Sequence, residues 1–276
     1  MDSQTLHYAL DLVSGSGLTL SPEQRAALQS SLVIMRANYR FHRVLFWGKI
    51  LCTKQDYFIA QGLTEDELGE KKTLYSLNCI DWYLLPPATD TLVAETSAVK
   101  GRFVGDPSHE YELVEMKRQG EGEEAMEEDI TLKIKEENRL AATIFVLDKE
   151  VSVVPRGAFI KTPLGHVQRN RSFEGLSVTE AGKLSSYFHF SEPVRLKKKS
   201  LLEKADLDPS IDFLDSIEED IPKGSWSLQW ERGNSVLVLR SLLWLGLTFY
   251  HVPMTPQHGF LYMGTGLKNL DLPFML

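Results

Sequence analysis

The acidic residues between positions 206 and 220 come nearest, by type and spacing, to a pair of groups for acid–base chemistry. Asp206, Asp208, Asp212 and Asp215 are separated by two, four and three residues. Glycoside hydrolysis needs two carboxyl groups facing each other across the substrate, one acting as acid and one as base or nucleophile. The same spacing also fits a solvated face or helix-capping positions. A hydrolase using the 206–220 carboxylates is therefore the enzymatic alternative.

His189 lies in an aromatic run, Tyr187–Phe190, where a histidine could act as a base. No nucleophile or acidic partner lies near it in the sequence, which favours a structural histidine. The seven histidines are scattered, and neither a Cys-x-x-Cys nor a His-Glu-x-x-His motif occurs. Gly264-Thr265-Gly266 lacks the third glycine of a nucleotide-binding loop, and no Gly-x-Ser-x-Gly elbow is present. The sequence predicts no catalytic residue, no cofactor and no metal.

Aromatic and apolar residues are concentrated in the last third of the chain. Trp226 and Trp230 fall on one face of a strand, because strand side chains alternate. Two tryptophans on one face indicate either the core of a sheet or the anchor of an interface, where Trp and Arg are enriched. The tail 272–276 is apolar, whereas a fraying end would be polar. The residues predicted for an interface are Trp226, Trp230, Arg240, Trp244, Phe274 and Leu276.

Helices are predicted mainly at the front of the chain. Leu6, Leu10 and Val13 recur at helical spacing, and Ser21 opens a second helix with a capping box. Further short helices are predicted at 89–99 and after Ser177, and residues 201–221 are expected to be helical or irregular. Strands are predicted at 44–51, 57–60, 72–82, 102–104, 130–146 (as two strands), 151–154, 226–231 and 236–243. Gly233-Asn234 is a hairpin signal between the last two strands. The predicted fold class is α+β, predominantly antiparallel sheet with N-terminal helices and a C-terminal β-unit.

An acidic segment interrupts the chain near its middle. Residues 120–129 carry six acidic side chains and no basic one, which is typical of an exposed loop or linker. The expected division is 1–118 (helices and first sheet), an acidic loop 119–129 and 130–276, or one continuous domain. The loop either only solubilises the chain or presents a negative face to a partner.

The charge balance argues against nucleic acid as a partner. The net charge is −8 with a pI near 5.5, and such a chain repels phosphate backbones. The basic run 195–199 fits a solvated face. No signal peptide and no bilayer-length apolar stretch is found, so we expect a soluble, intracellular protein with no membrane partner. Cys52 and Cys79 are expected to be reduced, buried thiols.

Several sequence runs resemble the radial spoke head protein 9 family of motile cilia and flagella. The runs are 44–50, 56–63, 72–78, 101–107, 173–177, 183–190, 221–227, 240–244 and 268–276. The Gly224–Ser227 and Arg240–Trp244 elements also look like the C-terminal region of the larger spoke head proteins 4 and 6. Leu245 departs from the family pattern, which has proline at this point.

The resemblance implies a non-enzymatic structural subunit of the axonemal radial spoke head. Such a subunit relays mechanical signals between the central pair and the dynein arms. The implied partners are head protein 1, head proteins 4 and 6 and, transiently, central pair projections, and a homodimer is also allowed. The implied location is the cytoplasm and cytoskeleton, in the axoneme of the cilium and flagellum. A free regulatory module that binds a peptide remains the third class of function.

Overall fold

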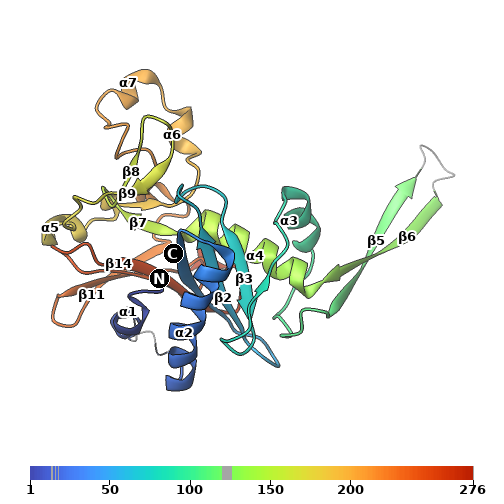
Figure 1. Cartoon of the computed structure of the whole chain (residues 1–276). Coiled ribbons are helices and arrows are strands. Elements are labelled where there is room, and N and C mark those ends of the chain that lie inside the picture. The colour runs from blue at the N-terminus through green and yellow to red at the C-terminus, as the bar shows by residue number, and fades with distance from the viewer. Residues whose placement is uncertain (14, 16, 18, 120–125, 276) are drawn as a thin grey trace.

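One large mixed sheet organises the protein. The computed structural model describes residues 1–275 except 14, 16, 18 and 120–125, and the side chains of residues 114–131 are not described. From one edge to the other, the sheet contains β11 (Trp226–Glu231), β12 (Val236–Ser241), β13 (Leu247–His251), β14 (His258–Gly264), β1 (Arg43–Ile50), β2 (Tyr57–Leu63), β3 (Lys72–Ser76) and β4 (Tyr83–Leu84) (Figure 1). The β1–β14 pair is parallel and the other neighbours are antiparallel. The predicted α+β class is confirmed.

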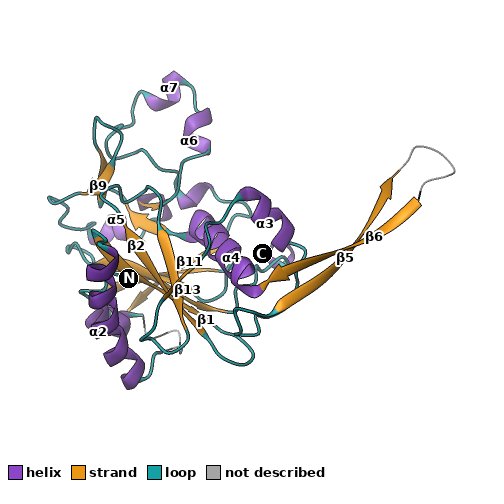
Figure 2. Ribbon diagram, turned by 45° about the vertical axis from the view of Figure 1, so that its right-hand side comes forward, coloured by secondary structure: helices purple, strands orange, loops and turns teal. Residues whose placement is uncertain are grey.

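Helices cover both faces of this sheet (Figure 2). On one face lie α1 (Leu6–Leu12) and α2 (Pro22–Tyr39), whose buried residues include Leu10, Leu28 and Leu32. On the other face lies α4 (Glu136–Val151), which packs Leu140 and Leu147 against the sheet. Both faces of the central strands are therefore buried in apolar cores.

The predicted capping box of α2 is confirmed. The Gln24 backbone N–H donates to Ser21 Oγ at 3.2 Å, and the Ser21 N–H donates to Gln24 Oε1 at 3.0 Å. Pro22 occupies the first turn, where its missing N–H costs nothing. The chain leaves the helix at Arg40 in a left-handed conformation, with φ 56°.

The join between β1 and β14 depends on a glycine. The β1–β2 register shifts between Phe46 and Gly48, which marks a β-bulge. Gly48 has φ +148° and lies opposite Tyr262 of β14, where a Cβ would come within 2.0 Å of the Tyr262 carbonyl oxygen. No other residue type fits this close backbone approach.

A long two-stranded hairpin projects from the body of the protein (Figure 1). It consists of β5 (Glu110–Gln119) and β6 (Met126–Lys135), paired along their whole length. The expected acidic loop 119–129 is wrong at both ends, since Gln119 is in β5 and 126–129 are in β6. Residues 120–125 of that loop lie outside the described residues.

Residues 130–146 were expected to form two strands, and the second half of this prediction is wrong. The chain leaves β6 at Lys135 and enters α4 at Glu136. This segment forms a helix because Leu140, Ile144, Leu147 and Val151 recur at helical spacing and are all buried against the sheet.

Two other predicted strands are corrected. Residues 102–104 form no strand, because the Val104 N–H bonds a side chain instead of a ladder. The strand expected at 72–82 ends at Ser76.

The remaining elements are α3 (Asp90–Thr96), β7 (Val153–Pro155), β8 (Phe159–Lys161), β9 (Val167–Arg169), α5 (Val178–Ala181), η2 (Leu184–Ser186), β10 (Tyr187–His189), α6 (Arg195–Lys198), α7 (Leu201–Lys204), η3 (Ile217–Glu219) and η4 (Leu272–Phe274).

The large sheet draws strands from both sides of the acidic segment. Its β1–β4 come from residues 43–84 and its β11–β14 from residues 226–264.

No described helix is both long and apolar enough to cross a membrane.

Candidate functional site

The aspartates of the enzymatic alternative do not converge. Asp212 forms a two-point ion pair with Arg156, at 2.7 and 2.8 Å, and Asp215 accepts three backbone N–H bonds at the start of α6. Asp208 accepts from the Ser210 N–H at 2.8 Å, while Asp206 is exposed. These contacts are those of caps and ion pairs, and they bring no two of the four carboxylates together as a catalytic pair.

His189 has an acidic partner that is distant in sequence. Its Nε2 lies 2.9 Å from both carboxylate oxygens of Asp220. Asp220 also accepts from Trp226 Nε1 at 2.8 Å and from Arg195 at 2.5 Å. Burial raises the pKa of Asp220, but the hydrogen bonds from His189, Trp226 and Arg195 outweigh it and hold that pKa below its usual value. With three donors on one carboxylate, the cluster ties 189–195 to the start of β11.

The predicted interface tryptophans face the α4 side of the sheet. Trp226 and Trp244 are 7% and 5% exposed and belong to the core, with Trp230 partly buried beside them. Arg240 of β12 pairs with Glu231 of β11 at 2.5 Å and is about one quarter exposed. All four side chains make contacts within this chain.

The apolar tail is split between core and surface. Leu272 is buried at 2% exposure, whereas Phe274 and Met275 are 89% and 71% exposed. Leu276 lies outside the described residues. Phe274 and Met275 therefore leave most of their apolar surface available to a partner.

A buried carboxylate missed by the sequence analysis anchors the projecting hairpin. Glu136, at the start of α4, accepts from the backbone N–H groups of 104–106 at 2.7, 2.7 and 3.0 Å. It also accepts from the hydroxyls of Tyr57, at 2.8 Å, and of Tyr111 in β5. Burial raises the pKa of Glu136, but these hydrogen bonds outweigh it and lower that pKa below its ordinary value. The carboxylate thus joins β2, the 104–106 loop and the root of the hairpin.

Arg139, one turn further along α4, completes this anchor. Its guanidinium stacks on the Phe103 ring, 4.2 Å from the centroid, and donates to the Gly101 carbonyl at 2.5 Å and to the Tyr111 hydroxyl at 3.1 Å. A Glu-x-x-Arg pair inside an apolar helical stripe was the signal for this site. It was hidden because the segment was expected to be strand.

Two further acids of α4 fix tryptophans, Trp47 in β1 and Trp244 in the connection between β12 and β13. Asp148 accepts from Trp47 Nε1 at 2.6 Å and from Gln61, and Glu150 accepts from Trp244 Nε1 at 2.7 Å. Buried indole N–H groups usually require such a partner. The helix is therefore held to the sheet by polar contacts as well as by its apolar stripe.

The two cysteines offer no reactive thiol. Burial raises the pKa of Cys52 and of Cys79 to about 12, so both remain protonated at neutral pH. Cys79 is buried and Cys52 is half-buried. Within the described part of the chain, no group of three His, Cys, Asp or Glu side chains is placed to hold a metal ion.

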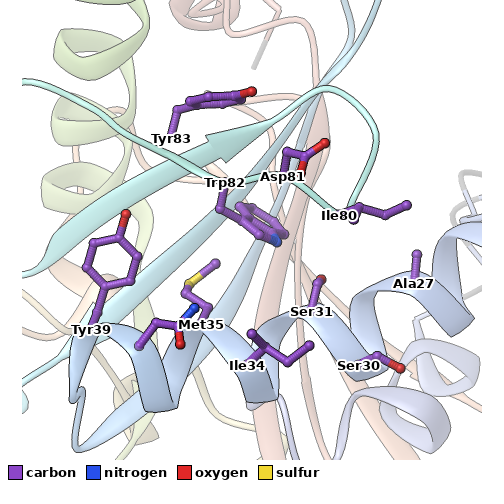
Figure 3. A pocket seen from close by; sticks show the side chains of 11 residues that line it. Ala27, Ser30, Ser31, Ile34, Met35, Tyr39, Ile80, Asp81, Trp82 and Tyr83 are labelled. Carbon is purple, nitrogen blue, oxygen red and sulfur yellow. The ribbon is translucent and has the colours of Figure 1, made fainter.

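Two grooves border the β4 edge of the sheet. The first, of about 540 Å³, lies between α2 and residues 80–83 and is named the α2 groove (Figure 3). Ile34, Tyr39 and Tyr83 line it, with Trp82 between the strand and the helix. The second, of about 880 Å³, lies between α4, residues 84–88 and residues 190–198 and is named the α4 groove. Both grooves offer room for a ligand or a partner.

His251 gives the protein a predictable response to acid. It is fully buried in β13, where Nε2 accepts from the Leu176 N–H at 3.1 Å and Nδ1–H donates to the Gln257 carbonyl at 3.0 Å. A second proton would have to occupy Nε2, facing another donor. Burial lowers the pKa of His251 to about 4, so the unfolded chain takes up this proton first as pH falls.

Because the unfolded chain binds this proton first, we expect the free energy of unfolding to fall by roughly 2 kcal/mol on account of His251 when the pH is lowered from 7 to 5. Its contribution is complete above the ordinary histidine pKa and is lost as pH falls toward 4. Urea unfolding of wild type and of His251→Asn at both pH values measures this share. The substitution should cost about 2 kcal/mol less at pH 5 than at pH 7, and an equal cost at the two values would contradict the assignment.

Comparison with known proteins gives full-length relatives. The chain is 65% identical over 277 residues to a radial spoke head protein 9 homolog of Danio rerio. It is 62% identical over 276 residues to the corresponding protein of Homo sapiens and 59% identical to that of Mus musculus. Each match covers 100% of both chains, while no family model matches. On this identity over its whole length, the chain belongs to the radial spoke head protein 9 family.

Proposed function

We propose that this chain is a non-enzymatic structural subunit of the radial spoke head in the axoneme of cilia and flagella. In that position it relays mechanical signals between the central pair and the dynein arms. The observation that carries the proposal is the 59–65% identity to radial spoke head protein 9 homologs over the full chain. The dispersed aspartates and the protonated thiols are consistent with a protein that has no reaction centre.

The fold suits a part that transmits force. An eight-stranded sheet covered by helices on both faces shares shear among many backbone hydrogen bonds. Polar contacts from Glu136 and Asp148 add fixed points between α4 and the sheet, and Glu150 adds one to the β12–β13 connection. Such a body moves as a unit, so a displacement at one surface reaches the opposite surface.

We place the principal interface at the C-terminal end of the chain. Phe274 and Met275 expose apolar side chains next to the buried Leu272, and Trp230 and Arg240 lie at the β11 side of the sheet. Exposed aromatic side chains on a firm support are typical of interface anchors. The expected partners are head proteins 4 and 6 and head protein 1, with transient contact to the central pair.

Replacing Phe274 by serine should weaken recovery of head protein 4 or 6 from a co-expressed complex by about 30-fold, as for an interface hot spot. The change leaves Leu272 in the core, so folding is preserved, unlike in a deletion of 272–276. Leu201→Ser is the matched control, since Leu201 is also 89% exposed but lies in α7. Equal recovery of the two variants would remove Phe274 from the interface.

A further inference from the structure

The outer edge of β4 presents backbone groups that the chain itself does not use. In its pairing with β3, Tyr83 lies opposite Tyr75 and Leu84 opposite Leu74, and the Leu85 N–H donates to the Thr73 carbonyl at 2.9 Å. Hydrogen-bonded and non-hydrogen-bonded pairs alternate in an antiparallel ladder. The N–H and C=O of Leu84 therefore point away from β3. Among the described residues, neither group has a hydrogen-bond partner.

This edge lies between the two grooves. Residues 80–83 border the α2 groove on one face of the sheet, and residues 84–88 border the α4 groove on the other. The side chains of Tyr83 and Leu84 are 55% and 48% exposed. A strand added to β4 would direct alternate side chains to opposite faces and would fill both grooves at once.

The surface of the α2 groove is unusual for a helix at a protein surface. Residues 26–35 of α2 contain no charged side chain, and Val33 and Ile34 are 60% and 58% exposed. Ile80, across the groove, is 62% exposed, and the single charged lining residue is Asp81, which accepts from Asn78 at 2.8 Å. An apolar side chain suits this groove and a charged one does not.

The α4 groove is basic, on a chain whose net charge is −8. Its lining includes five lysines, Lys71, Lys72, Lys149, Lys197 and Lys198, against four acids, Glu70, Asp90, Asp148 and Glu192. Asp148 lies 4.0 Å from Lys71 and Glu192 lies 3.2 Å from Lys197, so these two pairs cancel. Within the described part of the chain, Lys72, Lys149 and Lys198 form no ion pair. Against these three lysines stand Glu70 and Asp90, so the rim around the apolar floor of Ile144, Phe145 and Phe190 keeps a net positive charge.

We infer that β4 accepts an extended segment of another radial spoke head subunit as an added strand. The segment carries apolar side chains toward the α2 groove and apolar side chains flanked by acidic ones toward the α4 groove. This inference rests on the proposed function and names a second contact within it. A second copy of this chain fits poorly, because β4-to-β4 pairing in one continuous sheet would set two lysine-rich grooves side by side. Pro86 has no N–H, so the pairing is short and the grooves supply most of the affinity.

Leu84→Pro tests the strand pairing, because it removes the outward N–H and leaves the ladder to β3 intact. Proline is tolerated on an edge strand where its nitrogen faces solvent. Leu84→Ala is the control, since it shortens the side chain but keeps the N–H. We expect Leu84→Pro to bind a spoke head subunit at least tenfold more weakly than Leu84→Ala, in full-length chains co-expressed with head proteins 1, 4 and 6.

Two further measurements keep the test decisive if Leu84→Pro folds poorly. Replacing Lys72, Lys149 and Lys198 together by glutamate should also weaken that binding at least tenfold. In the wild-type complex, hydrogen exchange at the Leu84 amide should slow, because that amide gains an acceptor. Unchanged exchange at Leu84, or full binding by Leu84→Pro, would overturn the inference.

The outcomes separate this inference from the proposed function. If wild type binds none of the three head proteins, the proposed function itself fails. If wild type binds them and Leu84→Pro binds equally, only the β4 contact fails. A wild-type homodimer that Leu84→Pro converts to a monomer would overturn the choice of partner.

Discussion

Replacement of Gly48 by alanine is expected to lower the free energy of unfolding by about 4 kcal/mol or more. The φ of +148° strains any residue with a Cβ, and that Cβ would come within 2.0 Å of the Tyr262 carbonyl oxygen. Backbone cannot rotate away as a side chain can, so β1 and β14 must separate. Because ordinary domains have only 5–15 kcal/mol of stability, we expect much of this variant to be unfolded or aggregated.

Gly165→Ala separates the conformational strain from the close contact. Gly165 has φ +91°, but a Cβ there meets nothing within 4 Å. Its replacement should cost about 1–2 kcal/mol, from the left-handed backbone alone. Urea unfolding of both variants measures the difference, and similar costs would show that the β1–β14 contact tolerates a methyl group.

Replacement of Glu136 by alanine is expected to cost about 3–5 kcal/mol of stability. The loss exceeds that of an ordinary hydrogen bond because three backbone N–H groups and two tyrosine hydroxyls lose their acceptor inside the protein. Glu136→Gln keeps one acceptor oxygen and should cost less. Hydrogen exchange at the amides of 104–106 should accelerate in both variants, because these amides bond directly to the carboxylate.

The adjacent Glu137 supplies the matched control. It lies in the same first turn of α4 and has the same charge near the helix N-terminus. The described residues provide no hydrogen-bond or ion-pair partner for its carboxylate. Glu137→Ala should therefore cost no more than about 1 kcal/mol. If Glu136→Ala were as mild, the carboxylate would not be what holds the hairpin root.

The elements that were predicted correctly carry their signals within a few residues. The start of α2 follows from Ser21, Pro22 and Gln24, and the β11–β12 hairpin follows from the turn at Gly233-Asn234. Both residues of that turn have positive φ, 64° and 66°. Capping and turn chemistry are local, so they can be read before the tertiary structure is known.

The features that were missed depend on contacts between distant residues. The segment 130–146 contains β-branched residues that suit strand or helix, and only burial against the sheet selects α4. The parallel pairing of β1 with β14 has no signal in either strand. The acceptor role of Glu136 requires loop 104–106 and Tyr57 to meet at one point. Sequence patterns alone do not specify such meetings.

In the candidate site, too, local patterns were predicted correctly and the arrangement of distant segments was not. Strand alternation correctly placed Trp226 and Trp230 on one face, and that face is turned toward the core formed with α4. Composition could not distinguish a core face from an interface face, because both are apolar and aromatic. The grooves beside β4 are formed by α2, α4 and residues 190–198 together, so the sequence of no single segment indicates them.

The parallel β1–β14 pair also constrains how the chain is made. β1 ends at Ile50 and β14 begins at His258, so at about 5–20 residues per second the ribosome needs roughly 10–40 seconds between them. Residues 1–3 already bond Val44 and Phe46 on this edge of β1, but during that interval its part at 48–50 lacks a partner, and an unpaired strand edge is a template for aggregation. We therefore expect the growing polypeptide to depend on chaperones until its last strands emerge, and premature termination before β14 to yield a product that is degraded.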